Sequence, residues 1–138
     1  MTQSTITVEP GHRGTVSGVT AARFHQRAIV DIKNSTGRTL ALTTLVGRGD
    51  NVPLVEEANP ASSAWSFGPF GEPVAINVLI EHSENGDNFS PSKVIKPINV
   101  SKRADASHPA SHHVSTILSE DDVDDDYTDC IVNILQYK

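Results

Sequence analysis

The chain of 138 residues is long enough for one domain with its own core, and its net charge of -6 reflects 11 basic and 17 acidic residues. Seven of the acids lie within residues 120–129, so the other 128 residues carry ten acids against 11 bases. This local acidity favours a bound cation, and no basic stripe with interleaved aromatics indicates a nucleic-acid partner. The first residues lack a signal-peptide pattern, and no 18-residue apolar run predicts membrane insertion. We therefore expect a protein that is cytoplasmic as synthesised, with any release or cell-surface display following a route independent of a signal peptide.

Short segments rich in β-branched residues, separated by turn residues, run through the whole chain. No stretch of ten or more residues has the apolar period of a helix. The expected strands are residues 6–8, 16–22, 28–33, 39–46, 73–82, 93–100, 114–118 and 130–135. The pattern predicts a single all-β domain over residues 1–138, built as a sandwich or a barrel.

The connections between these strands carry their own predictions. Residues 83–88 hold an Asn-Gly pair and predict a hairpin between strands 73–82 and 93–100, with Pro97 at an edge or a bulge. Residues 101–111 are expected to form a polar connection. Residues 59–71 contain the single Trp65 and predict a loop pinned to the domain by its aromatic side chains, or a subunit contact; a platform for a sugar ring is the alternative.

The single cysteine and a group of three histidines are also candidate sites, and both fit structural roles better. Cys130 is the single cysteine and lies in an apolar run, so we expect a small buried core residue. His108, His112 and His113 indicate a solvated histidine-rich segment, with a transition-metal site as the alternative. The chain has no G-x-S-x-G motif, and its carboxylates crowd one loop instead of facing each other across a cleft. We therefore expect a protein that is not an enzyme.

The acidic segment 120–129 leads directly into the last apolar run. Carboxylates held together beside a folded strand raise each other's pKa, and a hard divalent cation relieves that repulsion. An EF-hand is excluded because Tyr127 stands where the loop requires Gly and Asn133 where it requires Glu. An irregular calcium loop between two strands fits better. Its candidate ligands are sufficient for one or two Ca²⁺ ions and comprise Glu120, Asp124, Asp126 and Asp129, with an oxygen of Thr128.

Residues 119–129 read Ser-Glu-Asp-Asp-Val-Asp-Asp-Asp-Tyr-Thr-Asp. This segment resembles the S-E-D-G-x-D-x-D-Y-N-D hallmark of the bacterial calcium-dependent fucose/mannose-binding lectins of the Pseudomonas lectin II type. The resemblance implies an antiparallel β-sandwich of about nine strands that forms a homodimer or homotetramer. It also implies that paired calcium ions bind vicinal hydroxyls of a monosaccharide directly, with Asp121 touching the sugar.

The chain departs from that family pattern at three places. Thr128 replaces an Asn, and the chain ends at Lys138 without the terminal Gly of the family. Arg23, Phe24 and His25 stand where the family has a short specificity loop, so we expect these three residues to contact carbohydrate. The sequence thus predicts a calcium-dependent lectin for carbohydrate or glycoconjugate partners. A calcium-stabilised structural or adhesion module without sugar binding is the alternative.

Overall fold

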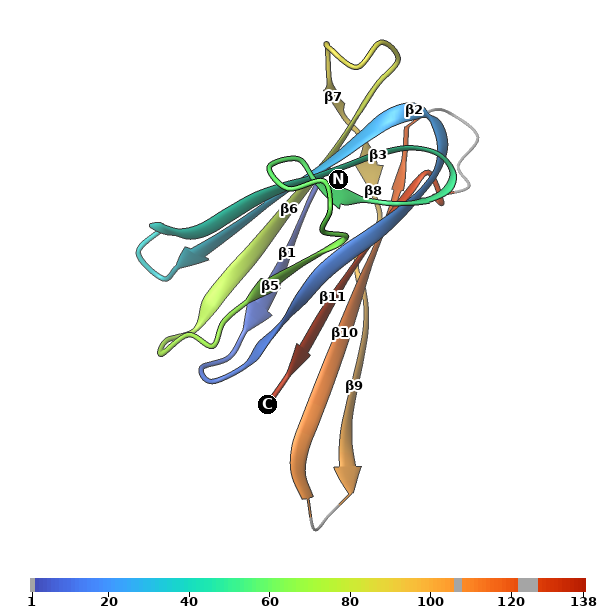
Figure 1. Cartoon of the computed structure of the whole chain (residues 1–138). Helices are drawn as coiled ribbons and strands as arrows, with labels where there is room; N and C mark the ends of the chain where they lie inside the picture. Colours follow the sequence, from blue (N-terminus) through green and yellow to red (C-terminus); the bar gives the residue numbers. More distant parts are fainter. Residues whose placement is uncertain (1, 106–107, 122–126) are drawn as a thin grey trace.

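The computed structural model describes residues 2–105, 108–121 and 127–138, which form one antiparallel sheet of eleven strands (Figure 1). The all-β prediction is confirmed. Three of the strands are only two residues long. The strands are β1 (Gln3–Val8), β2 (Arg13–Asn34), β3 (Thr39–Pro53), β4 (Val55–Glu56), β5 (Ala64–Phe67), β6 (Val74–Ser83), β7 (Ser90–Pro91), β8 (Lys93–Val94), β9 (Ile98–Asp105), β10 (His108–Glu120) and β11 (Cys130–Tyr137).

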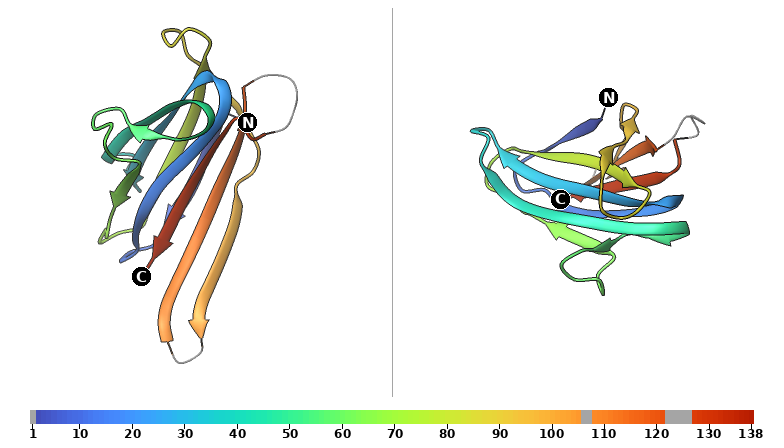
Figure 2. Two further views of the ribbon diagram at one scale, coloured as in Figure 1. Left: turned by 45° about the vertical axis from the view of Figure 1, so that its right-hand side comes forward. Right: turned by 90° about the horizontal axis from the view of Figure 1, so that it is seen from above.

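Strand β2 belongs to both layers of the fold. Its residues 14–20 pair with β11 and β5, whereas its residues 25–34 pair with β6 and β3. Between these halves the register with β3 shifts twice, on either side of Ala22. At this point the ribbon of β2 turns back on itself, so that the sheet folds over (Figures 1 and 2). One layer therefore contains β1 and β6, and the other contains β11, β10 and β9.

The core lies between these layers and is built from aliphatic side chains. Burial alternates along β1, β6 and β11, as expected for strands with one inward face. Each such Ile, Val or Leu contributes roughly 1.5–3 kcal/mol when it is removed from water. The largest fully buried apolar side chains are Ile32, Leu45, Leu54, Ile76, Ile80, Ile117 and Ile134.

Two predictions about strand connections are wrong. The expected strands 16–22 and 28–33 are one strand, β2, which continues through its bulges. The expected hairpin does not form, because β6 pairs with β1 on one side and β2 on the other, which leaves only Glu81 and His82 to pair with β7. The chain therefore crosses to the other layer, where β8 and β9 both pair with β10.

The predicted polar connection at residues 101–111 is also wrong. Strand β9 continues to Asp105, and β10 begins at His108, eleven residues before Ser119. Residues 101–111 contain no Val, Ile, Leu, Phe, Tyr or Trp, so the segment lacks the period-two apolar signal of a half-buried strand. The backbone pairing of β9 with β10 extends the sheet beyond the apolar core (Figure 1).

The aromatic segment is pinned to the domain, as predicted, but through a strand. Residues 64–67 form β5 and pair with residues 14–17 of β2. Phe67 is buried, and Trp65 and Phe70 pack against the core cluster. This burial argues against an open aromatic platform for a sugar ring.

The single cysteine, Cys130, is fully buried, as predicted. Burial raises the pKa of its thiol to about 12, so the sulfur is held as an unreactive thiol. Among the described residues, none forms a helix of the length and apolar character needed to cross a membrane.

Candidate metal centre

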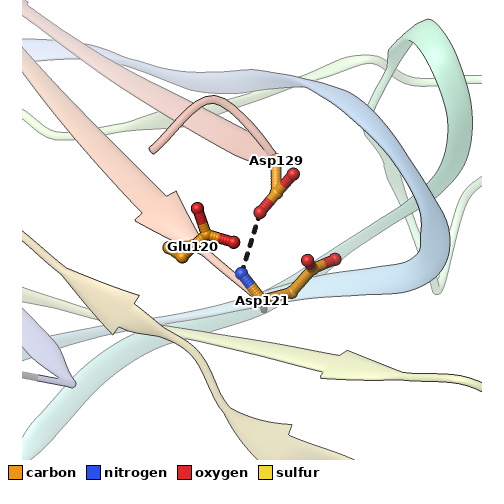
Figure 3. Close-up of side chains that lie close together, drawn as sticks. All are labelled: Glu120, Asp121 and Asp129. Atoms are coloured by element: carbon orange, nitrogen blue, oxygen red, sulfur yellow. Dashed lines mark hydrogen bonds between the residues drawn. The ribbon is translucent and has the colours of Figure 1, made fainter. Parts of the chain in front are cut away.

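Three carboxylates meet where β10 ends and β11 begins. Glu120 is the last residue of β10, Asp121 follows it, and Asp129 immediately precedes β11. An oxygen from each of the three lies within 4.8 Å of the others (Figure 3). Glu120 is 1% exposed and Asp129 is 8% exposed, so two of the three are withdrawn from water. Buried carboxylates at this spacing form a set of oxygen donors suited to a hard cation.

The antiparallel pairing of β10 with β11 fixes this geometry. Ser119 lies opposite Cys130, and the Asp129 amide donates to the Ser119 carbonyl at 3.2 Å. The Asp129 carbonyl in turn accepts from the Thr20 hydroxyl at 2.9 Å and from the Ala21 amide at 3.0 Å. The backbone at Asp129 is therefore tied to both neighbouring strands, β10 and β2.

Two backbone amides turn toward the carboxylates. The Asp121 amide donates to Oδ2 of Asp129 at 2.9 Å (Figure 3), and the Tyr127 amide donates to Oε2 of Glu120 at 3.4 Å. Tyr127 has a φ of 56°, a conformation that a bulky side chain rarely adopts. These bonds orient the carboxylates of Glu120 and Asp129 at the base of the loop.

Gln26 is a member of the site that the sequence analysis missed. Its Nε2 donates to Oδ2 of Asp121 at 2.8 Å, and the residue is 1% exposed. Its Oε1 is buried and has no hydrogen-bond partner among the described residues. A buried acceptor without a donor is costly, by about 1–3 kcal/mol. Gln26 is separated from Asp121 by 95 positions, so no local sequence motif could have identified it.

Burial controls the charge state of the cluster. The pKa of the Asp129 carboxyl is raised from 3.8 to about 8, first by its withdrawal from water. The Asp121 amide opposes this pKa shift, whereas side-chain hydrogen bonds with Glu120 and Asp121 add to it. Without a cation, Asp129 therefore holds a proton near neutral pH. A divalent ion would supply the positive charge that favours the ionised carboxylate of Asp129.

The predicted calcium ligands are placed as follows. Glu120 and Asp129 belong to the cluster, and Thr128 is exposed immediately before Asp129. Asp124 and Asp126 lie outside the described residues. Asp121, predicted as a sugar contact, lies inside the cluster itself, half-buried beside Glu120.

The predicted sugar contacts Arg23, Phe24 and His25 lie in the bulged part of β2. Phe24 stacks on His82 with ring centroids 6.2 Å apart, and the Arg23 guanidinium lies 5.8 Å from the centre of the Phe24 ring. His25 pairs in register with Ser83 of β6. These three residues form part of strand β2 instead of the short loop that the resemblance implies. Gln26, the next residue, makes the contact with the carboxylate cluster.

A cleft of about 510 Å³ adjoins the site through Gln26. His25 and Arg48 line it together with Phe89, and Arg27 lies 3.9 Å above the Phe89 ring while its Nε pairs with Glu81 at 2.7 Å. Cationic and aromatic groups thus line the cleft beside Gln26.

The family model of Fucose-binding lectin II (PA-IIL) matches residues 6–138. The chain belongs to this family. The family match extends over nearly the whole described fold as well as the acidic segment, and identifies the protein as a carbohydrate-binding lectin. No curated protein matches the chain.

Solved structures of bacterial lectins share the fold at low sequence identity. A high-affinity mannose-binding lectin of Ralstonia solanacearum has a TM-score of 0.60 and 18% identity, covering 98% of this chain and 96% of its own. A Chromobacterium violaceum lectin in complex with α-methyl-fucoside has a TM-score of 0.58 and 22% identity, covering 100% and 98%. The C-terminal domain of a Burkholderia cenocepacia lectin has a TM-score of 0.56 and 22% identity, covering 99% and 95%.

Proposed function

We propose that this lectin binds carbohydrate through calcium held by Glu120, Asp121 and Asp129. The observation that carries the proposal is the meeting of three carboxylates, two of them buried, within 4.8 Å in a member of the fucose-binding lectin II family. Ca²⁺ takes six to eight oxygen ligands, so three carboxylates leave coordination positions for further donors. Asp124, Asp126 and Thr128 remain predicted ligands and would complete the site for one or two ions.

Gln26 extends this ligand set from a second strand. Its amide is anchored on Asp121 through Nε2, and its Oε1 lacks a donor among the described residues. Rotation of the amide would exchange the bond between Nε2 and Asp121 for a contact between Oε1 and a bound cation. An amide oxygen is a normal calcium ligand and adds no negative charge.

The chemistry of recognition is ligand exchange. Two neighbouring sugar hydroxyls replace water on the calcium, and the charge of the ion makes these hydroxyls strong partners. No bond of the sugar breaks, so the site acts as a receptor and not as an enzyme. The solved neighbours include a mannose-binding lectin and a complex with α-methyl-fucoside, which supports fucose or mannose as the sugar class. Arg23, Phe24 and His25 are the proposed residues for selecting among such sugars.

Several sites in one assembly would raise the strength of binding. A single monosaccharide site binds weakly, and a homodimer or homotetramer supplies avidity. The outer face of β9, β10 and β11 carries Val100, 58% exposed, and Leu135, 36% exposed, which lie in one cross-strand row with Val114. A second copy covering this row would remove apolar surface from water. Light scattering with Val100→Asp beside wild type tests this assembly.

A calcium-stabilised module without sugar binding is the second candidate. It is favoured by one observation, namely that Arg23, Phe24 and His25 lie within β2, with Phe24 stacked on His82. Neither candidate requires catalysis.

Titration calorimetry with α-methyl-fucoside and α-methyl-mannoside separates the two candidates. The lectin proposal predicts binding heat in calcium that disappears in EDTA and in the Asp129→Asn variant. An exposed carboxylate on β3 provides the matched control, Asp50→Asn, which should bind as wild type does. Calcium uptake without binding of either sugar would support the structural module, and sugar binding that persists in EDTA would contradict the proposed mechanism.

A further inference from the structure

A second polar cavity lies far from the carboxylate cluster. It has a volume of about 400 Å³ and is lined by residues of β1, β9, β10, β11 and the loop between β1 and β2. His113 of β10 lines this cavity and precedes Glu120 by seven residues, a separation of roughly 23 Å along a strand. The cavity is therefore separate from the calcium site.

Two imidazoles face each other in this cavity. The rings of His12 and His113 have centroids 5.8 Å apart, with an angle of 58° between their planes. His113 is on the same face of β10 as the buried Ser115, because side chains alternate along a strand. His112 consequently turns to the opposite face and is exposed. Of the two adjacent histidines, only His113 faces His12.

His12 is shielded but chemically unsatisfied. Both of its ring nitrogens are inaccessible to solvent, and neither has a hydrogen-bond partner among the described residues. A neutral imidazole has one lone pair and one N–H, so burying it unpaired carries a cost of about 1–3 kcal/mol. A metal ion would take up that lone pair.

His113 is oriented for the same task. Its Nδ1 forms a hydrogen bond with the hydroxyl of Ser101, the residue opposite it on β9. This bond fixes the ring and leaves Nε2 as the second donor. Hydrogen bonding of one imidazole nitrogen while the other binds metal is the usual arrangement around a ligating histidine.

The remaining donors in the cavity contain oxygen. Glu9 lines the cavity three residues before His12. Its carboxylate does not meet both imidazoles within 4.8 Å, so its exposed side chain must change rotamer to bind a metal together with them. Two imidazoles and one carboxylate, completed by water, suit a borderline divalent metal, whereas calcium prefers oxygen ligands alone. We propose that His12, His113 and Glu9 form a site for a divalent transition metal of the Zn²⁺, Ni²⁺ or Cu²⁺ type, which ties the β1–β2 loop to β10.

Titration calorimetry with Zn²⁺ tests this site on tag-free protein saturated with calcium, so that the carboxylate loop is already occupied. We expect one zinc ion per chain in wild type. His12→Gln and His113→Gln each remove one nitrogen ligand of the metal. Loss of a residue that only hydrogen-bonds to a ligand weakens metal binding by roughly tenfold, so loss of the ligand itself should weaken zinc binding by at least that factor. His112→Gln is the matched control, because it changes the adjacent histidine on the opposite face, and should bind zinc as wild type does.

Cobalt substitution supplies an independent readout. Co²⁺ bound to wild type or His112→Gln should show the visible absorption bands of an ion with few nitrogen and oxygen ligands. These bands should be absent in His12→Gln and His113→Gln. The Asp129→Asn variant should retain zinc, which keeps this result distinct from the fate of the calcium proposal. The inference is overturned if calcium-saturated wild type takes up no zinc, or if both folded variants, checked by circular dichroism, bind zinc as tightly as wild type.

Discussion

Replacing Asp129 by Asn removes one negative charge from the cluster while leaving the side-chain shape almost unchanged. The Asn oxygen can still accept from the Asp121 amide, which donates to Oδ2 at 2.9 Å in the wild type. The change therefore isolates the ionisation of this carboxyl group. It should abolish the increase in the free energy of unfolding that calcium causes. It should also remove a large part of the dependence of that free energy on pH.

The sign and size of that dependence follow from the pKa of Asp129, which burial raises from 3.8 to about 8 in the calcium-free protein. The folded state holds a proton that the unfolded chain releases, so the stabilising contribution is fully present below about pH 3.8. It is lost as the pH rises through about 8. At about 1.4 kcal/mol per pKa unit, the loss between roughly pH 5 and pH 8 is on the order of 4 kcal/mol.

Urea unfolding in EDTA, followed by the fluorescence of the single Trp65, measures this quantity. Wild type should lose stability between pH 5 and pH 8 and regain part of it when calcium is added. Calcium at 100 times its dissociation constant would contribute about 2.7 kcal/mol. Asp129→Asn should show neither the pH effect nor the calcium effect, whereas Asp50→Asn should show both. Equal stability of calcium-free wild type at pH 5 and pH 8 would show that Asp129 holds no proton in the folded protein, and a normal calcium response in Asp129→Asn would show that its carboxylate does not bind the ion.

Two further substitutions test the scaffold of the site. Gln26→Leu removes the bond to Asp121 at 2.8 Å and should weaken calcium binding by roughly tenfold in calorimetry; unchanged affinity would show that Gln26 does not position the cluster. Gly14→Ala would place a Cβ 1.7 Å from the carbonyl oxygen of Leu135 and force β2 away from β11. We expect a loss of about 3 kcal/mol or more in urea unfolding. Gly71→Ala meets no atom within 4 Å and is the control, so equal losses in the two variants would contradict this packing argument.

The fold class was predictable from the sequence because strand formation left a local signal. Residues 74–80 and 130–134 are short apolar runs rich in β-branched residues, and they form β6 and β11, along which burial alternates. Strand partners left no such signal. The hairpin expected after residue 83 fails because β1 and β2 already occupy both edges of β6, which only the assembled sheet reveals. The extension of β9 and β10 was missed because pairing there depends on backbone hydrogen bonds, without an apolar face.

The site was predictable to the extent that it lies in one contiguous segment. Glu120 and Asp129 are nine residues apart and meet because β10 pairs with β11. Gln26 was missed because its side chain reaches Asp121 across the fold of β2, a contact set by tertiary structure. Likewise, His113 was considered with its neighbours in sequence, His108 and His112, whereas its partner is His12, 101 positions away.

The proposed function depends on calcium binding by the carboxylates at the junction of β10 and β11. The most direct measurement is titration calorimetry of purified, calcium-free protein with Ca²⁺ at neutral pH. We expect saturable uptake of one or two ions per chain, accompanied by proton release from Asp129, and loss of that uptake in Asp129→Asn. The absence of calcium uptake by wild type, or uptake that is identical in Asp129→Asn, would show that these carboxylates do not form a calcium site.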